Sequence, residues 1–313
     1  MFDSYYGGSS IWEDFKSRMF EREDVLVKLI LINCIVFFAV NLVTVLLLLT
    51  GFSGPGGGFS RMVNIWMALP PDVLEALIKP WTFITYQFLH AGIFHILFNM
   101  IVLYWSGRIF QEFLGNRKLL PVFLMGGIAG GLVYLAAYQV FPILSERMPQ
   151  LGMVGASASV FAVLVSIGSY LPNYTVNLIF FGPVRLKYII LVLIAIDLIS
   201  LAGQNAGGHF AHLGGALFGY FFTYQLQVGR DLSERPALWF DSTRDFVAGL
   251  FGAKELSGNL KVHKNDKAKQ KRKTKKQVKQ EEIDRILDKI AQSGYNSLTD
   301  EEKETLFKAS DRK

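Results

Sequence analysis

The chain has 313 residues, of which 51% are hydrophobic, and its formal net charge is +6 at neutral pH. Its positive mean hydropathy of +0.31 excludes an ordinary soluble globular protein. The lone cysteine, Cys34, lies inside the first apolar run and excludes a disulfide framework.

The apolar residues are concentrated in six long runs. Each run is close to the ~20 residues that a helix needs to cross a bilayer, and none alternates as the strands of a membrane barrel do. Residues 1–26 precede them and predict a cytoplasmic amphipathic leader, for which a solvent-exposed helix is the alternative. The sequence therefore predicts an all-α membrane protein with a six-helix domain at 27–228, its spans at about 27–50, 91–110, 119–141, 152–171, 186–203 and 209–227.

Lysine and arginine favour one side of this predicted bundle. They are frequent after residue 228 and in the loop 108–118, whereas the loops on the other side carry few. The positive-inside rule then places both termini in the cytoplasm. As a result, the second, fourth and sixth spans begin at the outer face.

Polar side chains inside the predicted spans form three clusters. Such residues are costly in lipid and mark functional sites by default. All three clusters lie at the N-terminal ends of even-numbered spans, hence at one depth near the outer face. They are His90, His95 and Asn99 in "HAGIFHILFNM", Ser157 and Ser159 in "GASAS", and His209 and His212 in "GGHFAHLGG".

These residue types suit acyl transfer. A serine hydroxyl needs an adjacent base, usually histidine, and the tetrahedral intermediate needs hydrogen-bond donors. Ser157 is favoured over Ser159 as nucleophile because Phe161, at i+4, can pack against the imidazole of the base. His95 and Asn99 can supply the donors.

Glycine spacing favours one of the two histidines of the last span. His212, Gly215 and Gly219 form one stripe that lets the fourth and sixth helices approach closely. His209 shares roughly that face but lies a turn nearer to water. His212 is therefore the favoured base, with His209 as the alternative.

Three motifs together, "HILFNM", "GASAS" and "AHLGGALFG", resemble those of the rhomboid intramembrane serine proteases of the bacterial six-helix type, over residues 60–228. The resemblance implies that Ser157 and His212 form a catalytic dyad without an obligatory acid. It also implies an oxyanion site made by His95, Asn99 and the Ser157 backbone N–H, and a structural role for His90. No metal or organic cofactor is expected.

Two positions depart from the family pattern. Trp81 is kept in a loop segment where the family has Trp-Arg, but Thr82 replaces the arginine, which puts the anchoring of that loop in question. Ala158 follows the nucleophile where glycine is usual, and its methyl group is expected to narrow the site or change substrate preference.

Asp197 is the only acid well inside a span. A catalytic triad that includes Asp197 and a zinc site made by the histidines are both disfavoured. A structural hydrogen bond from Asp197, to Ser200 or the backbone, is preferred over a Ser-His-Asp triad. A zinc site made by His90, His95, His209 and His212 is disfavoured because no carboxylate or thiol accompanies them.

The tail has two predicted parts. Residues 229–280 form a basic, largely disordered linker, whose segment 261–280 is a candidate for binding anionic lipid headgroups. Nucleic-acid binding is not expected because aromatic residues do not interleave the lysines. Residues 281–313 predict a small helical hairpin, with a capping box from Ser297 to Asp300 at its second helix.

The sequence as a whole predicts an intramembrane serine endopeptidase that cleaves transmembrane proteins near the outer face of a bacterial inner membrane. A non-catalytic rhomboid-like protein that binds membrane clients is the alternative. A transporter is disfavoured because the polar residues cluster near one face rather than at the midplane.

Overall fold

The computed structural model describes residues 24–52, 58–146, 148–178, 182–203 and 205–250, together with 285–286, 289 and 298–303. The chain divides into two compact units, residues 1–245 and 246–313. The predicted leader at 1–26 lies outside the described residues up to residue 23, and so does the basic segment 261–280.

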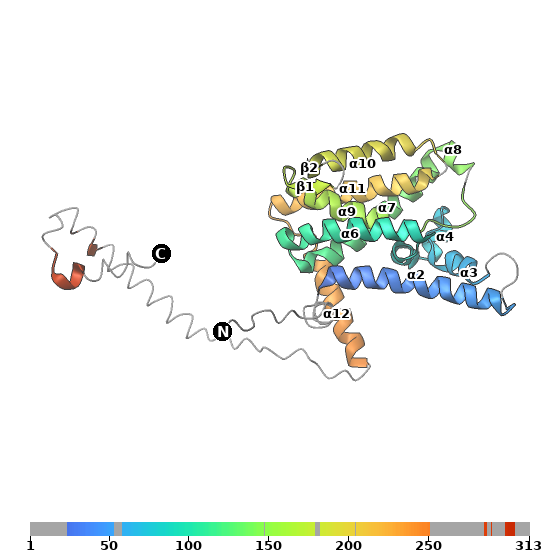
Figure 1. The fold of residues 1–313 in the computed structure, drawn as a ribbon, viewed down its shortest axis with the longest axis horizontal. Coiled ribbons are helices and arrows are strands. Elements are labelled where there is room, and N and C mark those ends of the chain that lie inside the picture. The colour runs from blue at the N-terminus through green and yellow to red at the C-terminus, as the bar shows by residue number, and fades with distance from the viewer. Residues whose placement is uncertain are drawn as a thin grey trace, which may run out of the picture. The chain divides into compact units, whose positions relative to one another are not determined.

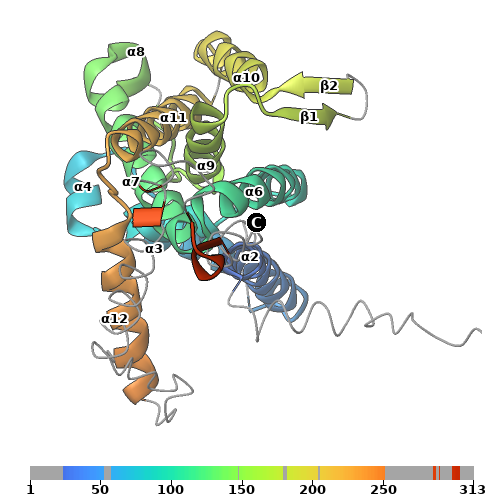
Figure 2. The same ribbon diagram turned by 90° about the vertical axis from the view of Figure 1, so that its left-hand side faces the viewer.

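The first unit is a bundle of helices, shown in Figures 1 and 2. Its helices are α2 (Val25–Leu49), α3 (Gly58–Met67), α4 (Val73–Ile78), α5 (Thr82–Thr85), the 3-10 turn η2 (Tyr86–Phe88), α6 (Ile93–Leu114), α7 (Asn116–Val140), α8 (Pro142–Ser145), α9 (Ser157–Tyr170), α10 (Leu186–Ser200) and α11 (Ala206–Gln227). Helix α12 (Glu234–Leu250) begins in this unit and runs past its end at residue 245.

Helix α9 is the centre of this bundle. It packs against α6, α7 and α11, and ten of its 14 residues are buried. A helix that is apolar on all sides is expected in such a position. At 1.5 Å per residue, α9 is only about 21 Å long, which is shorter than the ~30 Å hydrocarbon layer of a bilayer.

Each of the six predicted spans contains one helix, but the described residues support only part of the six-span prediction. Three of these helices, α2, α6 and α7, are long and apolar enough to cross a membrane. Helices α9 and α10 have only 14 and 15 residues. The chain is thus a mostly helical membrane protein, and the count of six spans stays a prediction.

A short sheet corrects the all-α prediction. Strands β1 (Thr175–Leu178) and β2 (Gly182–Arg185) pair antiparallel, with Thr175 opposite Arg185 and Val176 opposite Val184. The β-branched residues suit a strand, and Val176 packs against the core of the bundle. The sequence prediction treated this stretch as a loop because four residues are too few to show a period.

Helix α12 begins at Glu234, inside the segment predicted as a disordered linker. Just before it, Asp231 forms an ion pair with Lys118 at 2.6 Å and accepts a hydrogen bond from the Ser233 N–H at 2.9 Å. These contacts fix the chain at the start of the helix. The predicted linker is therefore helical in its first part.

In the second unit, the capping box lies two residues later than predicted. The Thr299 N–H donates to Glu302 Oε2 at 2.8 Å, and the Glu302 N–H donates to Thr299 Oγ1 at 3.3 Å. Glutamate is the usual partner at this position, which explains why Thr299 and Glu302 are chosen over Ser297 and Asp300. The hairpin itself stays a prediction.

The loop between α3 and α6 is anchored without the arginine that Thr82 replaces. Lys79 Nζ, Trp81 Nε1 and Thr85 Oγ1 donate to the carbonyls of residues 65, 66 and 67, at 2.9, 2.7 and 2.6 Å. These are the last carbonyls of α3, which have no partner within their own helix. Trp81 therefore fixes the loop through the end of α3.

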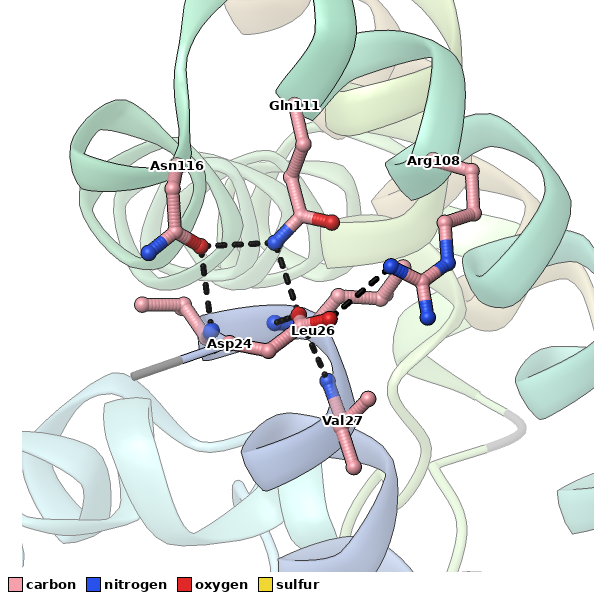
Figure 3. Close-up of polar contacts among 7 residues, drawn as sticks. Asp24, Leu26, Val27, Arg108, Gln111 and Asn116 are labelled. Atoms are coloured by element: carbon pink, nitrogen blue, oxygen red, sulfur yellow. Dashed lines mark hydrogen bonds and ion pairs between the residues drawn. The ribbon is translucent and has the colours of Figure 1, made fainter. Parts of the chain in front are cut away.

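A polar cluster at the start of α2 joins it to α6 and α7 (Figure 3). Asp24 is the N-cap of α2, and its carboxylate also accepts hydrogen bonds from Arg108 Nη1 at 2.8 Å and Gln111 Nε2 at 2.9 Å. Asn116 Oδ1 accepts from the Val25 N–H and from Gln111. Together with the buried side chains of Leu26, Leu29 and Phe37, this cluster holds α2 against the bundle.

This cluster predicts an acid-sensitive stability. Burial raises the pKa of the Asp24 carboxyl, but hydrogen bonds from Gln111 and Val27 and the positive charge of Arg108 lower it by more. The net effect is a pKa below the ordinary value of 3.8. A lowered folded-state pKa contributes stability that is present above the unfolded pKa and is lost as pH falls through the folded value. We expect unfolding in detergent to become easier below about pH 4, with part of this loss absent in Asp24→Asn.

At neutral pH, Asp24→Asn is expected to cost about 1 kcal/mol, since the site is partly solvent-screened. Asp72→Asn is the matched control, because Asp72 caps α4 with one hydrogen bond, to the Glu75 N–H at 2.8 Å. An acid sensitivity that is identical in Asp24→Asn and wild type would refute the role of this cluster.

Candidate active site

The favoured nucleophile and base lie in direct contact. Ser157 is the first residue of α9, and His212 lies in the second turn of α11. Ser157 Oγ is 2.7 Å from His212 Nε2. This distance allows the hydroxyl to donate its proton to the imidazole, which is the geometry that activates a serine.

Two glycines bring α9 and α11 together at backbone distance. A Cβ atom at Gly215 would overlap the carbonyl of Ala158, and one at Gly219 would overlap the carbonyl of Ala162. The ring of Phe161 stacks on His212 with a centroid distance of 4.8 Å and an angle of 12°. The helical spacing thus predicted both the close approach and the ring contact.

His95 and Asn99 lie beside the serine at the start of α6. His95 Nδ1 faces the Ala91 N–H at 3.5 Å, which leaves Nε2 as the donor on the side toward Gly155. A Cβ at Gly155 would lie 2.8 Å from His95 Nε2, and the φ of +134° at this position also requires glycine. The turn before Ser157 therefore has no side chain where the ring of His95 must fit.

Asn99 is buried, and one of its two Nδ2 hydrogens is donated to the His95 carbonyl at 2.8 Å. This bond orients the amide. His90 packs edge-on against His95, with ring centroids 5.1 Å apart. His90 thus contacts His95 rather than Ser157 or His212, a position that suits support of the neighbouring ring.

The structure corrects the prediction for Asp197. Its Oδ1 lies 2.9 Å from His212 Nδ1 and 2.6 Å from His209 Nδ1, so its partners are the two histidines and not Ser200. An acid on the helix that directly precedes the helix of the base was a usable signal, because consecutive elements are usually neighbours in space. The prediction placed its partner within its own helix instead.

Ser159 is hydrogen-bonded away from the site. It is fully buried, and its Oγ donates to Gln87 Oε1 at 2.9 Å. Gln87 in turn donates to the carbonyls of Phe83 and Leu124, so that it joins η2 to α7 and α9. Gln87 was not predicted as a site residue, because a buried amide in the three-residue 3-10 helix η2 leaves no periodic pattern in the sequence.

Ala158 occupies a space that a glycine of α7 leaves open. A Cβ at Gly130 would lie 2.6 Å from the Ala158 methyl group, so the absence of a side chain at 130 accommodates the extra methyl at 158. The departure from the usual glycine is therefore paired with a gap in the neighbouring helix.

In the part of the chain that the structure describes, His90, His95, His209 and His212 are not gathered into one metal-binding group. Among the described residues, Asp197, His209 and His212 offer ligand atoms within 4.8 Å of one another. Two ligands of one tetrahedral zinc ion lie about 3.3 Å apart, but the Asp197 contacts are 2.6 and 2.9 Å. The distances fit hydrogen bonds.

A cavity of about 700 Å³ opens beside Ser157. His95, Asn99 and His212 line it, and it extends between α6 and α10 to Phe94, Phe98 and Leu193. Phe94 and Phe98 are 71% and 64% exposed on the outside of the bundle. The cavity thus connects the polar site with an apolar outer surface.

Comparison with known proteins assigns a family to most of this bundle. Residues 78–228 match the rhomboid domain, and residues 268–312 match a family of unknown function, DUF6576. The rhomboid match covers the helices that carry Ser157, His212, His95 and Asn99.

Relatives come from plants and animals. The chain is 31% identical over 161 residues to RHOMBOID-like protein 12, mitochondrial, of Arabidopsis thaliana, covering 48% of this chain and 47% of that protein. It is 30% identical over 140 residues to Presenilin-associated rhomboid-like protein A, mitochondrial, of Danio rerio, covering 44% and 35%. Rhomboid-related protein 2 of Mus musculus is 33% identical over 141 residues, covering 41% and 42%.

The matched region spans less than half the length of each of these relatives. It lies in the bundle that the motifs around His95, Ser157 and His212 had marked. Residues 78–228 of the chain therefore form a rhomboid domain.

Proposed function

We propose that the chain is an intramembrane serine endopeptidase that cleaves transmembrane segments of other proteins. The contact of 2.7 Å between Ser157 Oγ and His212 Nε2 carries the proposal. The cavity supports a protein substrate, because it leads from this pair to apolar residues on the outside of the bundle.

In the proposed reaction, His212 Nε2 takes the hydroxyl proton as Ser157 Oγ attacks the scissile carbonyl carbon. His95, Asn99 and the Ser157 N–H donate to the oxygen that becomes negative. The C–N bond then breaks, and His212 gives its proton to the leaving amine. Water, activated by the same imidazole, hydrolyses the acyl-enzyme.

The short helix α9 suggests where this chemistry takes place. If its C-terminal end reaches one membrane surface, its first residue stops roughly 10 Å short of the other surface. Ser157 then lies below the surface, and water reaches it through the cavity. The distribution of basic residues favours the outer face for this opening and the cytoplasm for both termini.

The proposal also includes the membrane in which the chain lies and the lipids that it contacts. A bacterial inner membrane is suggested by the compact six-helix pattern, while the named relatives are eukaryotic and two carry the word mitochondrial. We also propose anionic lipid headgroups as partners of residues 261–280, on the basis of their charge.

A fluorophosphonate probe tests the proposal directly. Its phosphorus forms a bond to an activated serine oxygen and fluoride leaves. We expect the purified full-length protein in detergent to be labelled, Ser157→Ala to lose labelling completely, and Ser159→Ala to keep it, because Ser159 faces Gln87.

A known active rhomboid protease in the same detergent is the positive control. If that protein is labelled while wild type is not, the proposal fails and the non-catalytic client-binding protein takes its place. Labelling that depends on Ser159 rather than Ser157 would also overturn the assignment.

A further inference from the structure

A buried carboxylate occurs on α10, a mostly apolar helix on which few side chains are buried. Helix α10 lies at the edge of the bundle beside α9 and α11 (Figures 1 and 2). Three of its 15 residues are buried, namely Leu186, Ile190 and Asp197. A buried acid in such a helix is costly unless its hydrogen bonds compensate, which makes its partners informative.

The packing of α10 fixes where this carboxylate lies. Near the start of the helix, Ile190 fills the space above Gly168 of α9, where a Cβ would overlap the Ile190 side chain. Two helical turns later, the same face carries Asp197 to α11. Asp197 Oδ1 there meets His212 Nδ1 at 2.9 Å and His209 Nδ1 at 2.6 Å.

The three side chains form a continuous chain of hydrogen bonds: Asp197 Oδ1 to His212 Nδ1, and His212 Nε2 to Ser157 Oγ at 2.7 Å. A carboxylate can only accept, so it selects the tautomer of His212 that carries the proton on Nδ1. In that tautomer the lone pair of Nε2 faces the serine hydroxyl.

We propose that Asp197 is a positioning residue for His212, so that this rhomboid works with a Ser-His-Asp arrangement rather than with a dyad alone. The carboxylate holds the ring in the required tautomer and stabilises the imidazolium that forms when Ser157 attacks. This inference rests on the proposed protease function. Asp197 does not take up the proton of the Ser157 hydroxyl. That proton stays on His212 until the leaving amine receives it.

His209 has a secondary role in this arrangement. Its Nδ1 approaches the same oxygen, Oδ1, whereas Oδ2 is buried without a hydrogen-bond partner among the described residues. The carboxylate is therefore held through one oxygen and from two sides. His209 steadies the acid but does not contact Ser157, so its loss is expected to matter less than the loss of Asp197.

The test separates the maximal rate of fluorophosphonate labelling from the affinity for the probe. In Asp197→Asn we expect the maximal labelling rate of the full-length protein in detergent to fall at least about 100-fold, with probe affinity unchanged within about twofold. Asp197→Glu keeps the charge and is expected to regain part of the rate. His209→Ala is expected to lose less than about tenfold.

Ser200→Ala is the matched control, one turn further along α10, and is expected to label as wild type. Thermal unfolding in the same detergent shows whether each variant is folded. Asp197→Asn within about threefold of wild type would overturn the inference and leave the dyad, and so the protease proposal, intact. So would an Asp197→Glu variant that is folded and no faster than Asp197→Asn.

Two other results remain distinguishable. The inference fails if Asp197→Asn and His209→Ala lower the maximal labelling rate equally and a chelator inhibits wild type. Asp197 and His209 would then act as ligands of a bound metal ion. If wild type is not labelled at all, the protease proposal fails first, and this inference fails with it.

Discussion

Replacing both Ser157 and His212 by alanine is expected to slow cleavage of a transmembrane substrate no more than replacing either one alone. A serine without its base is a weak nucleophile, and a base without its nucleophile has nothing to activate. Each single substitution is therefore expected to cost on the order of 10⁶-fold in kcat, and the double substitution about the same. Cleavage of a reporter transmembrane protein in reconstituted vesicles measures this.

Ser159→Ala with His209→Ala is the matched control pair, since these residues have the same types and lie on the same helices. Ser159 bonds to Gln87 rather than to a histidine. His209 bonds to Asp197 rather than to Ser157, and its ring lies edge-on to that of His212 with centroids 5.7 Å apart. We expect their effects to be small and independent. If His212→Ala kept more than about 1% of the activity, another group would have to serve as the base.

The location of the candidate site follows from the sequence because it depends on local spacing. Within one helix, residues at i, i+3, i+4 and i+7 share a face whatever surrounds them. That rule placed Phe161 with Ser157 and placed Gly215 and Gly219 with His212. Both groups of residues then meet at the contact between α9 and α11.

Contacts between distant segments could not be predicted in this way. The helical period says which residues share a face of α10, but not toward which helix that face is turned. Asp197 was therefore expected to bond to Ser200 or the backbone, although it lies against His209 and His212. The direction in which α10 packs against α11 decides this, and that direction leaves no period in the sequence.

The same limit applies to complementary packing. The methyl of Ala158 fits because Gly130 lacks one, and Ser159 is buried because Gln87 accepts its hydrogen bond. In each case the partner lies on a different element, so neither residue alone predicts the other. The sequence-based expectation that Ala158 narrows the site did not include this compensation.

The second large effect is expected for Gly215→Ala. A Cβ at this position would overlap the carbonyl oxygen and carbonyl carbon of Ala158, the latter at 2.8 Å, and both are backbone atoms of α9. Because no side-chain rotation can relieve the clash, α11 has to move away from α9. His212 lies one turn before Gly215 and would move with it, away from Ser157.

A displacement of about 1 Å at a reacting pair costs about 100-fold in rate. We therefore expect Gly215→Ala to lower the rate of fluorophosphonate labelling by at least about 100-fold. The overpacking is also expected to destabilise the bundle by about 1–3 kcal/mol. The better helix propensity of alanine returns only up to about 1 kcal/mol, so the clash decides the sign.

Gly107→Ala is the matched control, on α6. The three atoms nearest to a Cβ there all belong to the side chain of Leu26, with Cδ1 at 2.6 Å, and the end of a leucine can shift. We expect wild-type labelling and a change in stability below about 1 kcal/mol. Wild-type labelling by Gly215→Ala would instead show that Ser157 and His212 react without this close contact of α9 and α11, and the geometry on which the protease assignment rests would have to be abandoned.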